Sequence, residues 1–113
     1  MELNLPNNQI GESLLVTLPA GIDSLMLKQE FESLLAKVES SGLRRVVIDC
    51  SAVELMDSAD LKALMHVTNC IQVMGHEAVL CGVLPVVAFA AVALEVDLHS
   101  LKSVGTLTEI CAQ

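Results

Sequence analysis

The order of hydrophobic and polar positions predicts a β-hairpin at the start of the chain. Residues from Leu3 to Ile10 and from Ser13 to Thr17 are typical of two short strands, and Gly11-Glu12 between them is a turn signal. Pro19-Ala20-Gly21 then ends the second strand. We therefore expect two neighbouring antiparallel strands before the first helix.

A helix is predicted next, because apolar residues recur at a spacing of three or four. Asp23 or Ser24 can cap its first turn, and Ser40-Ser41-Gly42 ends it. The apolar face consists of Leu27, Phe31, Leu34, Leu35 and Val38. The charged residues assigned to the opposite, solvent-facing side are Lys28, Glu30, Glu32, Lys37 and Glu39.

Two continuous apolar runs indicate strands that are buried on both faces, and each precedes a helix. Val46-Val47-Ile48 ends at Asp49, and Ala78-Val79-Leu80-Cys81 ends at Gly82. The helix after the first run begins near Asp57-Ser58, and its apolar positions are Leu61, Leu64, Met65, Thr68 and Ile71 or Gln72. The helix after the second run begins at Pro85, and one of its faces carries Val86, Phe89, Ala90 and Ala93.

This alternation of strands and helices predicts an α/β fold in a single domain, residues 1–113. A short edge strand is expected over Leu101 to Val104, and Thr106, with Glu109, is expected to cap a last helical stub. Right-handed crossovers then give a mixed, mostly parallel sheet of about five strands with the N-terminal hairpin and about four helices.

Composition excludes several classes of function. The chain is 53% hydrophobic, as expected of a folded domain, and has fourteen Asp and Glu against six Lys and Arg, a net charge of −8. That charge repels a phosphate backbone, and two Phe with no Trp or Tyr leave little for base stacking. We therefore expect no nucleic-acid partner.

The cysteines and the longest apolar segment bear on location. The cysteines lie far apart in apolar stretches or near the chain end, and no signal peptide follows Met1, so we expect reduced thiols in a cytoplasmic protein. The uncharged run Ala78 to Leu94 contains Gly82 and Pro85, which favours a buried strand, turn and helix over a membrane span. The four cysteines are Cys50, Cys70, Cys81 and Cys111.

Chemistry is expected where strands end and helices begin, in Asp49 through Ser58 and in Gly82 through Pro85. Ser58 is either an ordinary capping serine or a phosphoacceptor, since a phosphate at a helix N-terminus meets unpaired N–H donors and a favourable dipole. Three carboxylates, Asp49, Asp57 and Asp60, could hold Mg²⁺, but capping and solvation explain them as well. No catalytic triad, metal-ligand spacing or phosphate loop is present, so we expect a non-enzymatic protein without metal or cofactor.

The segment from Val46 to Pro85 resembles the STAS domains of sulfate transporters and anti-sigma factor antagonists. The resemblance rests on Val46-Val47-Ile48-Asp49, on Met56-Asp57-Ser58 and the helix after it, and on Gly82-Val83-Leu84-Pro85. It is greatest for the small single-domain STAS proteins of bacterial stressosomes and extends over nearly the whole chain.

The resemblance implies a stress-response partner switch that acts on transcription. A serine-protein kinase of the histidine-kinase-ATPase type would phosphorylate Ser58 to release a bound regulator, and a PP2C-like phosphatase would reverse the reaction. Asp57 matches a position that shapes the phosphorylation site, and Asp49 would lie close by. The resemblance also implies STAS paralogues as partners in a large assembly.

One position differs from the family pattern and keeps other functions open. Many simple antagonists have Ser-Gly-Leu after Asp-Ser, whereas this chain has Ala59-Asp60-Leu61. Asp60 suits the helix dipole but opposes a nearby phosphate. It therefore favours an alternative, a non-phosphorylated STAS scaffold or transporter-associated binding module. A small enzyme or ligand carrier that uses the acidic corner is a further alternative.

Overall fold

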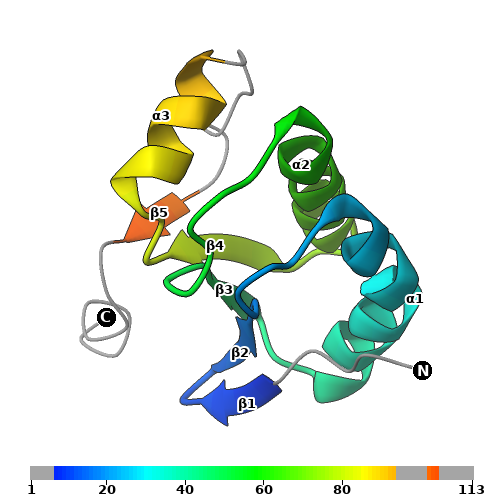
Figure 1. The fold of residues 1–113 in the computed structure, drawn as a ribbon. Helices are drawn as coiled ribbons and strands as arrows, with labels where there is room; N and C mark the ends of the chain where they lie inside the picture. Colours follow the sequence, from blue (N-terminus) through cyan, green and yellow to red (C-terminus); the bar gives the residue numbers. More distant parts are fainter. Residues whose placement is uncertain (1–6, 94–101, 105–113) are drawn as a thin grey trace.

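The protein is described here by a computed structural model, which covers residues 7–93 and 102–104 (Figure 1). Its elements alternate between strands and helices after an opening hairpin, as the hydrophobic pattern predicts. In chain order they are β1 (Asn7–Ile10), β2 (Ser13–Thr17), α1 (Ser24–Ser41), β3 (Arg45–Asp49), α2 (Ser58–Val73), β4 (Glu77–Cys81), α3 (Pro85–Ala93) and β5 (Lys102–Val104).

The sheet has five strands in the same order as the sequence, β1-β2-β3-β4-β5. β1 pairs antiparallel with β2, and every later pair is parallel. Leu15, Val47 and Val79 lie opposite one another across β2, β3 and β4, so they form a row on one face of the sheet. The mixed, mostly parallel sheet with its N-terminal hairpin is confirmed.

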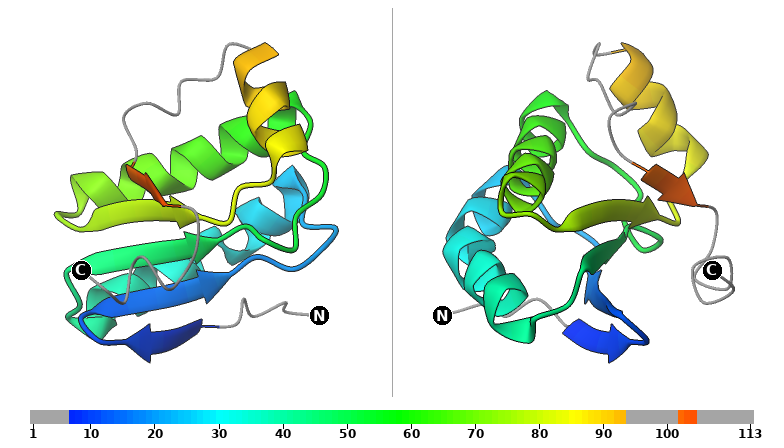
Figure 2. Two further views of the ribbon diagram at one scale, coloured as in Figure 1. Left: turned by 90° about the vertical axis from the view of Figure 1, so that its left-hand side faces the viewer. Right: turned by 180° about the vertical axis from the view of Figure 1, so that it is seen from behind.

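The main hydrophobic core lies between the sheet and its helices. α1 and α2 lie side by side on one face, and α3 lies beside the edge strand β5 (Figures 1 and 2). Val16, Ile48 and Leu80 of neighbouring strands point into this core and contact side chains of the helices. A second cluster on the opposite face contains Leu15, Val47, Val79 and Cys81. The central strands are therefore buried on both faces, which explains their continuous apolar runs.

The ends of α1 follow the predicted capping rules. Asp23 is the N-cap residue, and its Oδ1 accepts a hydrogen bond from the Met26 N–H at 2.8 Å. The helix stops at Gly42, which has a φ of 68°, in the left-handed region that glycine enters without strain. Both ends were thus predictable from residue type.

Two predictions about helix faces need correction. Glu30 was expected on the solvent side of α1, but it is only 6% exposed, because it lies three residues after Leu27 and four before Leu34, on the buried stripe. On α3 Val87 and Ala91 are buried and Ala90 packs partly against the core, while Val86 and Phe89 are exposed. Of the predicted apolar face of α3, Ala90 therefore packs, but the buried positions Val87 and Ala91 lie outside that face.

Some predictions fall outside the described residues: the strand start at Leu3, the cap at Thr106, His99 and Cys111. Among the described helices, none is long and apolar enough to cross a membrane. Cys50, Cys70 and Cys81 are free thiols.

Candidate functional site

Ser58 lies at the start of α2, beyond the carboxyl end of β3. It is the first residue of the helix, and Asp57 before it is the N-cap residue. The Ser58 side chain is half-buried, and its hydroxyl makes no hydrogen bond within the part of the chain that the structure describes. Its position beside the N-cap agrees with the sequence prediction. Because Asp57 performs the capping, the hydroxyl of Ser58 has no structural task at this helix end.

Asp57 and Asp60 form a reciprocal capping box. Asp57 Oδ1 accepts from the Asp60 N–H at 2.8 Å, and Asp60 Oδ2 accepts from the Asp57 N–H at 3.0 Å. A box of this kind satisfies two N–H groups that would otherwise lack partners at the start of a helix. It holds the backbone on both sides of Ser58 in a fixed geometry.

Asp60 also joins the starts of the two packed helices. Its Oδ1 accepts from the Ser24 N–H, the first amide of α1, at 2.8 Å, although the two residues are 36 positions apart. Its side chain is 9% exposed, and each carboxylate oxygen has a backbone donor. Asp60 thus serves as a buried structural acceptor; capping was one explanation that the sequence offered for it, but the bond to α1 was not indicated.

Two backbone donors stay available next to Ser58. The N–H groups of Ser58 and Ala59 make no hydrogen bond within residues 7–93, since the capping box serves Asp57 and Asp60, and the Leu61 N–H bonds to the Asp57 carbonyl at 3.0 Å. Unpaired amides at a helix N-terminus suit a negatively charged group.

Asp49, at the end of β3, has different neighbours. Its Oδ1 accepts from the Ser51 N–H at 3.0 Å, and the carboxylate lies beside the Cys81 thiol at the end of β4. Burial, and then the charge and hydrogen bond of Asp49, raise the pKa of Cys81 to about 11. Burial, and then the charges of Cys81 and Asp49, raise the pKa of Cys50 to about 12. Both thiols stay protonated at neutral pH and are poor nucleophiles.

Gly82 allows the loop after β3 to approach the end of β4. Its φ is 66°, and a Cβ placed there would lie 2.9 Å from the Cβ of Ser51 and 3.3 Å from Oδ1 of Asp49. Any other residue would collide with the loop that leads from Asp49 to Ser58. This contact explains why the segment Gly82-Val83-Leu84-Pro85 begins with glycine.

Two large apolar side chains are exposed, one in the loop before Ser58 and one in the first turn of α1. Leu55, three residues before Ser58, is 78% exposed. Leu25, which follows the Ser24 amide bonded to Asp60, is 63% exposed. The sequence did not reveal them, because Leu55 lies in a loop without periodicity and Leu25 lies in the first turn of α1, before the buried stripe that begins at Leu27.

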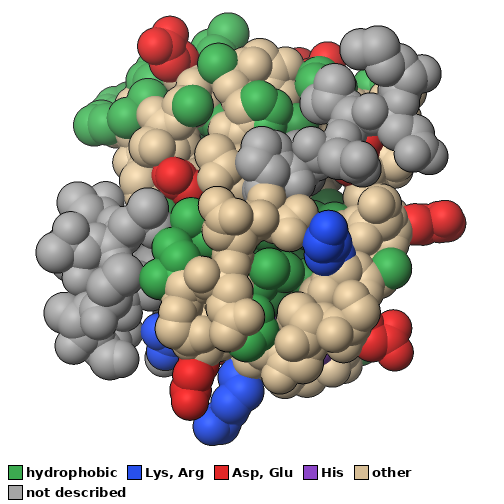
Figure 3. Space-filling model, turned by 90° about the horizontal axis from the view of Figure 1, so that it is seen from below, with side chains coloured by type: hydrophobic (Ala, Val, Ile, Leu, Met, Phe, Trp, Pro, Cys, Tyr) green, Lys and Arg blue, Asp and Glu red, His purple; other side chains and the backbone are tan. Residues whose placement is uncertain are grey.

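Charge is distributed without a large basic patch on the face seen in Figure 3, where Asp and Glu side chains lie at separate places around the outline. No group of three His, Cys, Asp or Glu side chains that could hold a metal occurs within the described ranges. The two described histidines have structural surroundings: His66 stacks on Phe31, and His76 Nδ1 lies 2.7 Å from the Leu43 carbonyl oxygen.

Comparison with known proteins identifies a family and several solved structures that are similar to this chain. A family model described as the STAS domain matches residues 4–106. The RsbS protein of Moorella thermoacetica, solved as a serine-to-glutamate variant, has a TM-score of 0.78 at 24% identity, over 92% of this chain and 88% of that chain. A chain of the stressosome, described as a signal integration and transduction hub, has a TM-score of 0.74 at 24% identity, over 91% and 90%.

The anti-sigma factor antagonist SpoIIAA in its unphosphorylated form has a TM-score of 0.68 at 10% identity, over 96% of this chain and 94% of that chain. No curated protein matches the sequence. At these identities the structural neighbours show a shared fold, and the family model shows the family.

Proposed function

This chain belongs to the STAS domain family, and we propose that it acts as an anti-sigma factor antagonist or stressosome-type partner switch controlled by phosphorylation of Ser58. A serine kinase of the histidine-kinase-ATPase type would modify Ser58, and a PP2C-like phosphatase would restore it. The unmodified form holds a regulatory partner, and the phosphorylated form releases it. The protein works by binding and not by catalysis.

The observation that carries this proposal is that the Ser58 hydroxyl is not engaged, although the backbone around it is held by hydrogen bonds. Its hydroxyl has no hydrogen bond among the described residues, while the capping box of Asp57 and Asp60 holds the backbone on either side. A kinase can therefore modify Ser58 without breaking a structural contact. The two unpaired amides, of Ser58 and Ala59, can meet the new phosphate.

The effect of a phosphate would be electrostatic. It adds about −1.5 to −2 charges at neutral pH, next to Asp57 and four residues after Glu54, whose side chains are both exposed. Asp60, whose charge opposes a nearby phosphate, has both carboxylate oxygens engaged by backbone N–H groups. A docked partner would have to desolvate the added charge, so its affinity falls while the fold stays the same. A coupling of about 1–3 kcal/mol changes affinity about 5–150-fold, which is sufficient for a switch.

Assembly with STAS paralogues is the second part of the proposal. One structural neighbour is a stressosome component. The mean hydropathy of +0.62 is high for a small domain, and exposed Leu25 and Leu55 offer apolar area for contacts with other subunits.

Intact mass measurement with phosphosite mapping tests the proposal on protein isolated from its own cells, resting and stressed. We expect a single phosphate on Ser58 whose occupancy changes with stress. The result that contradicts the switch is an unmodified Ser58 in both states and after incubation with the kinase and ATP, which would favour a constitutive scaffold.

Binding measurements then separate the charge from other effects of substitution. Ser58→Ala should hold the partner constitutively, and Ser58→Asp should bind it weakly. Ser40→Asp is the charge control, because Ser40 is an exposed serine in the last turn of α1, away from the start of α2. Equal partner affinity for wild type, Ser58→Ala and the phosphorylated protein would overturn the mechanism.

A further inference from the structure

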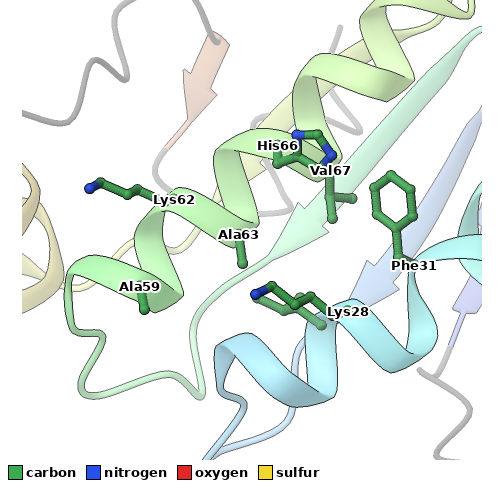
Figure 4. A pocket seen from close by; sticks show the side chains of 8 residues that line it. Lys28, Phe31, Ala59, Lys62, Ala63, His66 and Val67 are labelled. Atoms are coloured by element: carbon green, nitrogen blue, oxygen red, sulfur yellow. The ribbon is translucent and has the colours of Figure 1, made fainter.

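A groove lies between α1 and α2 and starts at the residue that follows Ser58. Its volume is about 450 Å³, within the range of ligand pockets. Figure 4 shows Ala59, Ala63 and Val67 projecting from α2 toward α1, with Lys28 and Phe31 on the facing helix. The groove is thus built by the packing of two helices that are far apart in the sequence.

The floor of the groove is apolar because of the residues that the two helices bring together. Leu27, Ala63 and Val67 are buried below it. Ala59 and Ala63 are one helical turn apart, and their short side chains leave the space open. Phe31 and His66, one from each helix, stack with ring centroids 5.4 Å apart at the end of the groove away from Ala59 (Figure 4).

The rim of the groove is positively charged. Lys28 comes from α1 and Lys62 from α2, and both side chains are exposed. Neither makes an ion pair with any residue of the described part of the chain. A protein with a net charge of −8 thus places two unpaired ammonium groups beside one apolar hollow. In Figure 4 the Lys28 side chain extends between the two helices, and the Lys62 side chain extends from α2 away from Lys28.

We propose that this groove binds a segment of a partner protein in which a large apolar side chain lies between two carboxylates. The apolar floor takes the side chain, and Lys28 and Lys62 pair with the carboxylates. Two separate cations favour a peptide with two acidic residues over a small ligand with a single anionic group. The inference concerns the chemistry of the partner and does not require phosphorylation of Ser58.

Two synthetic twelve-residue peptides test this proposal. Both carry the same central leucine and phenylalanine, flanked by glutamates in one peptide and by lysines in the other. Titration of the ¹⁵N-labelled full chain, followed by NMR, should shift the amides of Ala59, Ala63 and Val67 with the glutamate peptide only. In the double variant Lys28→Glu/Lys62→Glu we expect the preference to reverse, with a loss of at least about tenfold in affinity for the glutamate peptide.

Two further variants keep the experiment decisive. Lys37→Glu is the charge control, because Lys37 is an exposed lysine of α1 that does not line the groove. Ala59→Trp fills the groove from an exposed position and should abolish binding of the glutamate peptide without a change of charge. Equal binding of the two peptides, shifts confined to residues outside the groove, or no binding of the glutamate peptide at millimolar concentration would each overturn the proposal. Because both peptides are tested on the unmodified chain, this failure is distinguishable from an absence of phosphate on Ser58.

Discussion

Helices α2 and α3 follow neighbouring parallel strands of one sheet, yet they begin in different ways. α2 starts with two aspartates in a capping box, one of which also bonds α1. α3 starts at Pro85, and its first two backbone hydrogen bonds, from Val87 and Ala88, both return to the Leu84 carbonyl. The start of α2 is defined by charged side chains. The start of α3 is defined by backbone conformation and by the small size of Gly82 in the turn before it.

The difference shows that the two strand-to-helix connections of one sheet can have different tasks. The connection from β3 to α2 positions Ser58, and the connection from β4 to α3 leaves space for a neighbouring loop. Carboxylates at α2 satisfy the backbone and leave the Ser58 hydroxyl unengaged. At the neighbouring corner the absence of a side chain on Gly82 lets the loop from Asp49 pass close by. The two corners thus depend on each other through that loop, and four measurements can separate their contributions.

The largest loss of stability is expected from Asp60→Ala. The change removes the buried carboxylate and leaves the partly buried N–H groups of Ser24 and Asp57 without their acceptors, which should lower the free energy of unfolding by about 3 kcal/mol. Asp57→Ala removes an exposed cap and should cost only about 1 kcal/mol. Urea denaturation measures both values. Equal losses would show that the bond from Asp60 to α1 adds nothing beyond the cap.

Gly82→Ala should follow, at about 2–3 kcal/mol, because the new Cβ meets Ser51 at 2.9 Å in a left-handed conformation. Gly42→Ala is the matched control, since Gly42 has a φ of 68° but no atom within 4 Å of the added Cβ. Its cost should be about 1 kcal/mol, the conformational part alone. Thermal or urea unfolding gives the comparison, and similar values for the two variants would rule out a close contact at Gly82.

A smaller effect is expected from pH, through the thiols at the ends of β3 and β4. The folded state raises the pKa of Cys50 to about 12 and of Cys81 to about 11, from an ordinary value of 9.0. Above pH 9 the unfolded chain therefore loses protons that the folded chain keeps, and stability falls as pH rises. The loss between pH 8 and pH 10 should be about 1 kcal/mol for each thiol.

Urea unfolding at several pH values measures this slope. The double variant Cys50→Ala/Cys81→Ala is less stable at every pH because it leaves cavities, but its stability should fall less between pH 8 and pH 10. An unchanged slope in the double variant would assign the pH dependence to other groups.

The smallest effect on stability is expected from Phe89→Ala on α3. Phe89 is 80% exposed, so the change should stay within about 0.5 kcal/mol. Val87→Ala, two residues earlier on the opposite, packing side of the helix, should cost about 1–2 kcal/mol by the loss of buried methyl groups. The pair tests which side of α3 packs, and the reverse ranking would restore the face that the sequence predicted.

Much of the fold was predictable because local rules agree with the packing. The strand Ser13–Thr17 has its predicted bounds, and α1 begins after Asp23 and ends at Gly42, as these two residue types predict. The helix α2 was expected from its periodicity, and the position of Ser58 next to its cap followed from that start.

The predictions that were wrong or missing depend on how the elements pack, which the residue pattern of a single helix does not contain. α3 is apolar on every side, so its periodicity could not select Val87 and Ala91 over Phe89. Glu30 is buried on a stripe that its charge argued against. The bond from Ser24 to Asp60 and the groove beside Lys62 exist only after α1 and α2 pack, and no rule based on spacing within one segment reveals them.

The strand order of the sheet, β1-β2-β3-β4-β5, has a consequence for synthesis on the ribosome. Each strand after the first pairs with the strand made immediately before it, so no strand has to wait for one that the ribosome has yet to produce. Every β-α unit that emerges finds an edge already formed and covers it in turn. The chain can therefore fold in the order in which it is translated, and the growing edge of the sheet at any moment is a single strand.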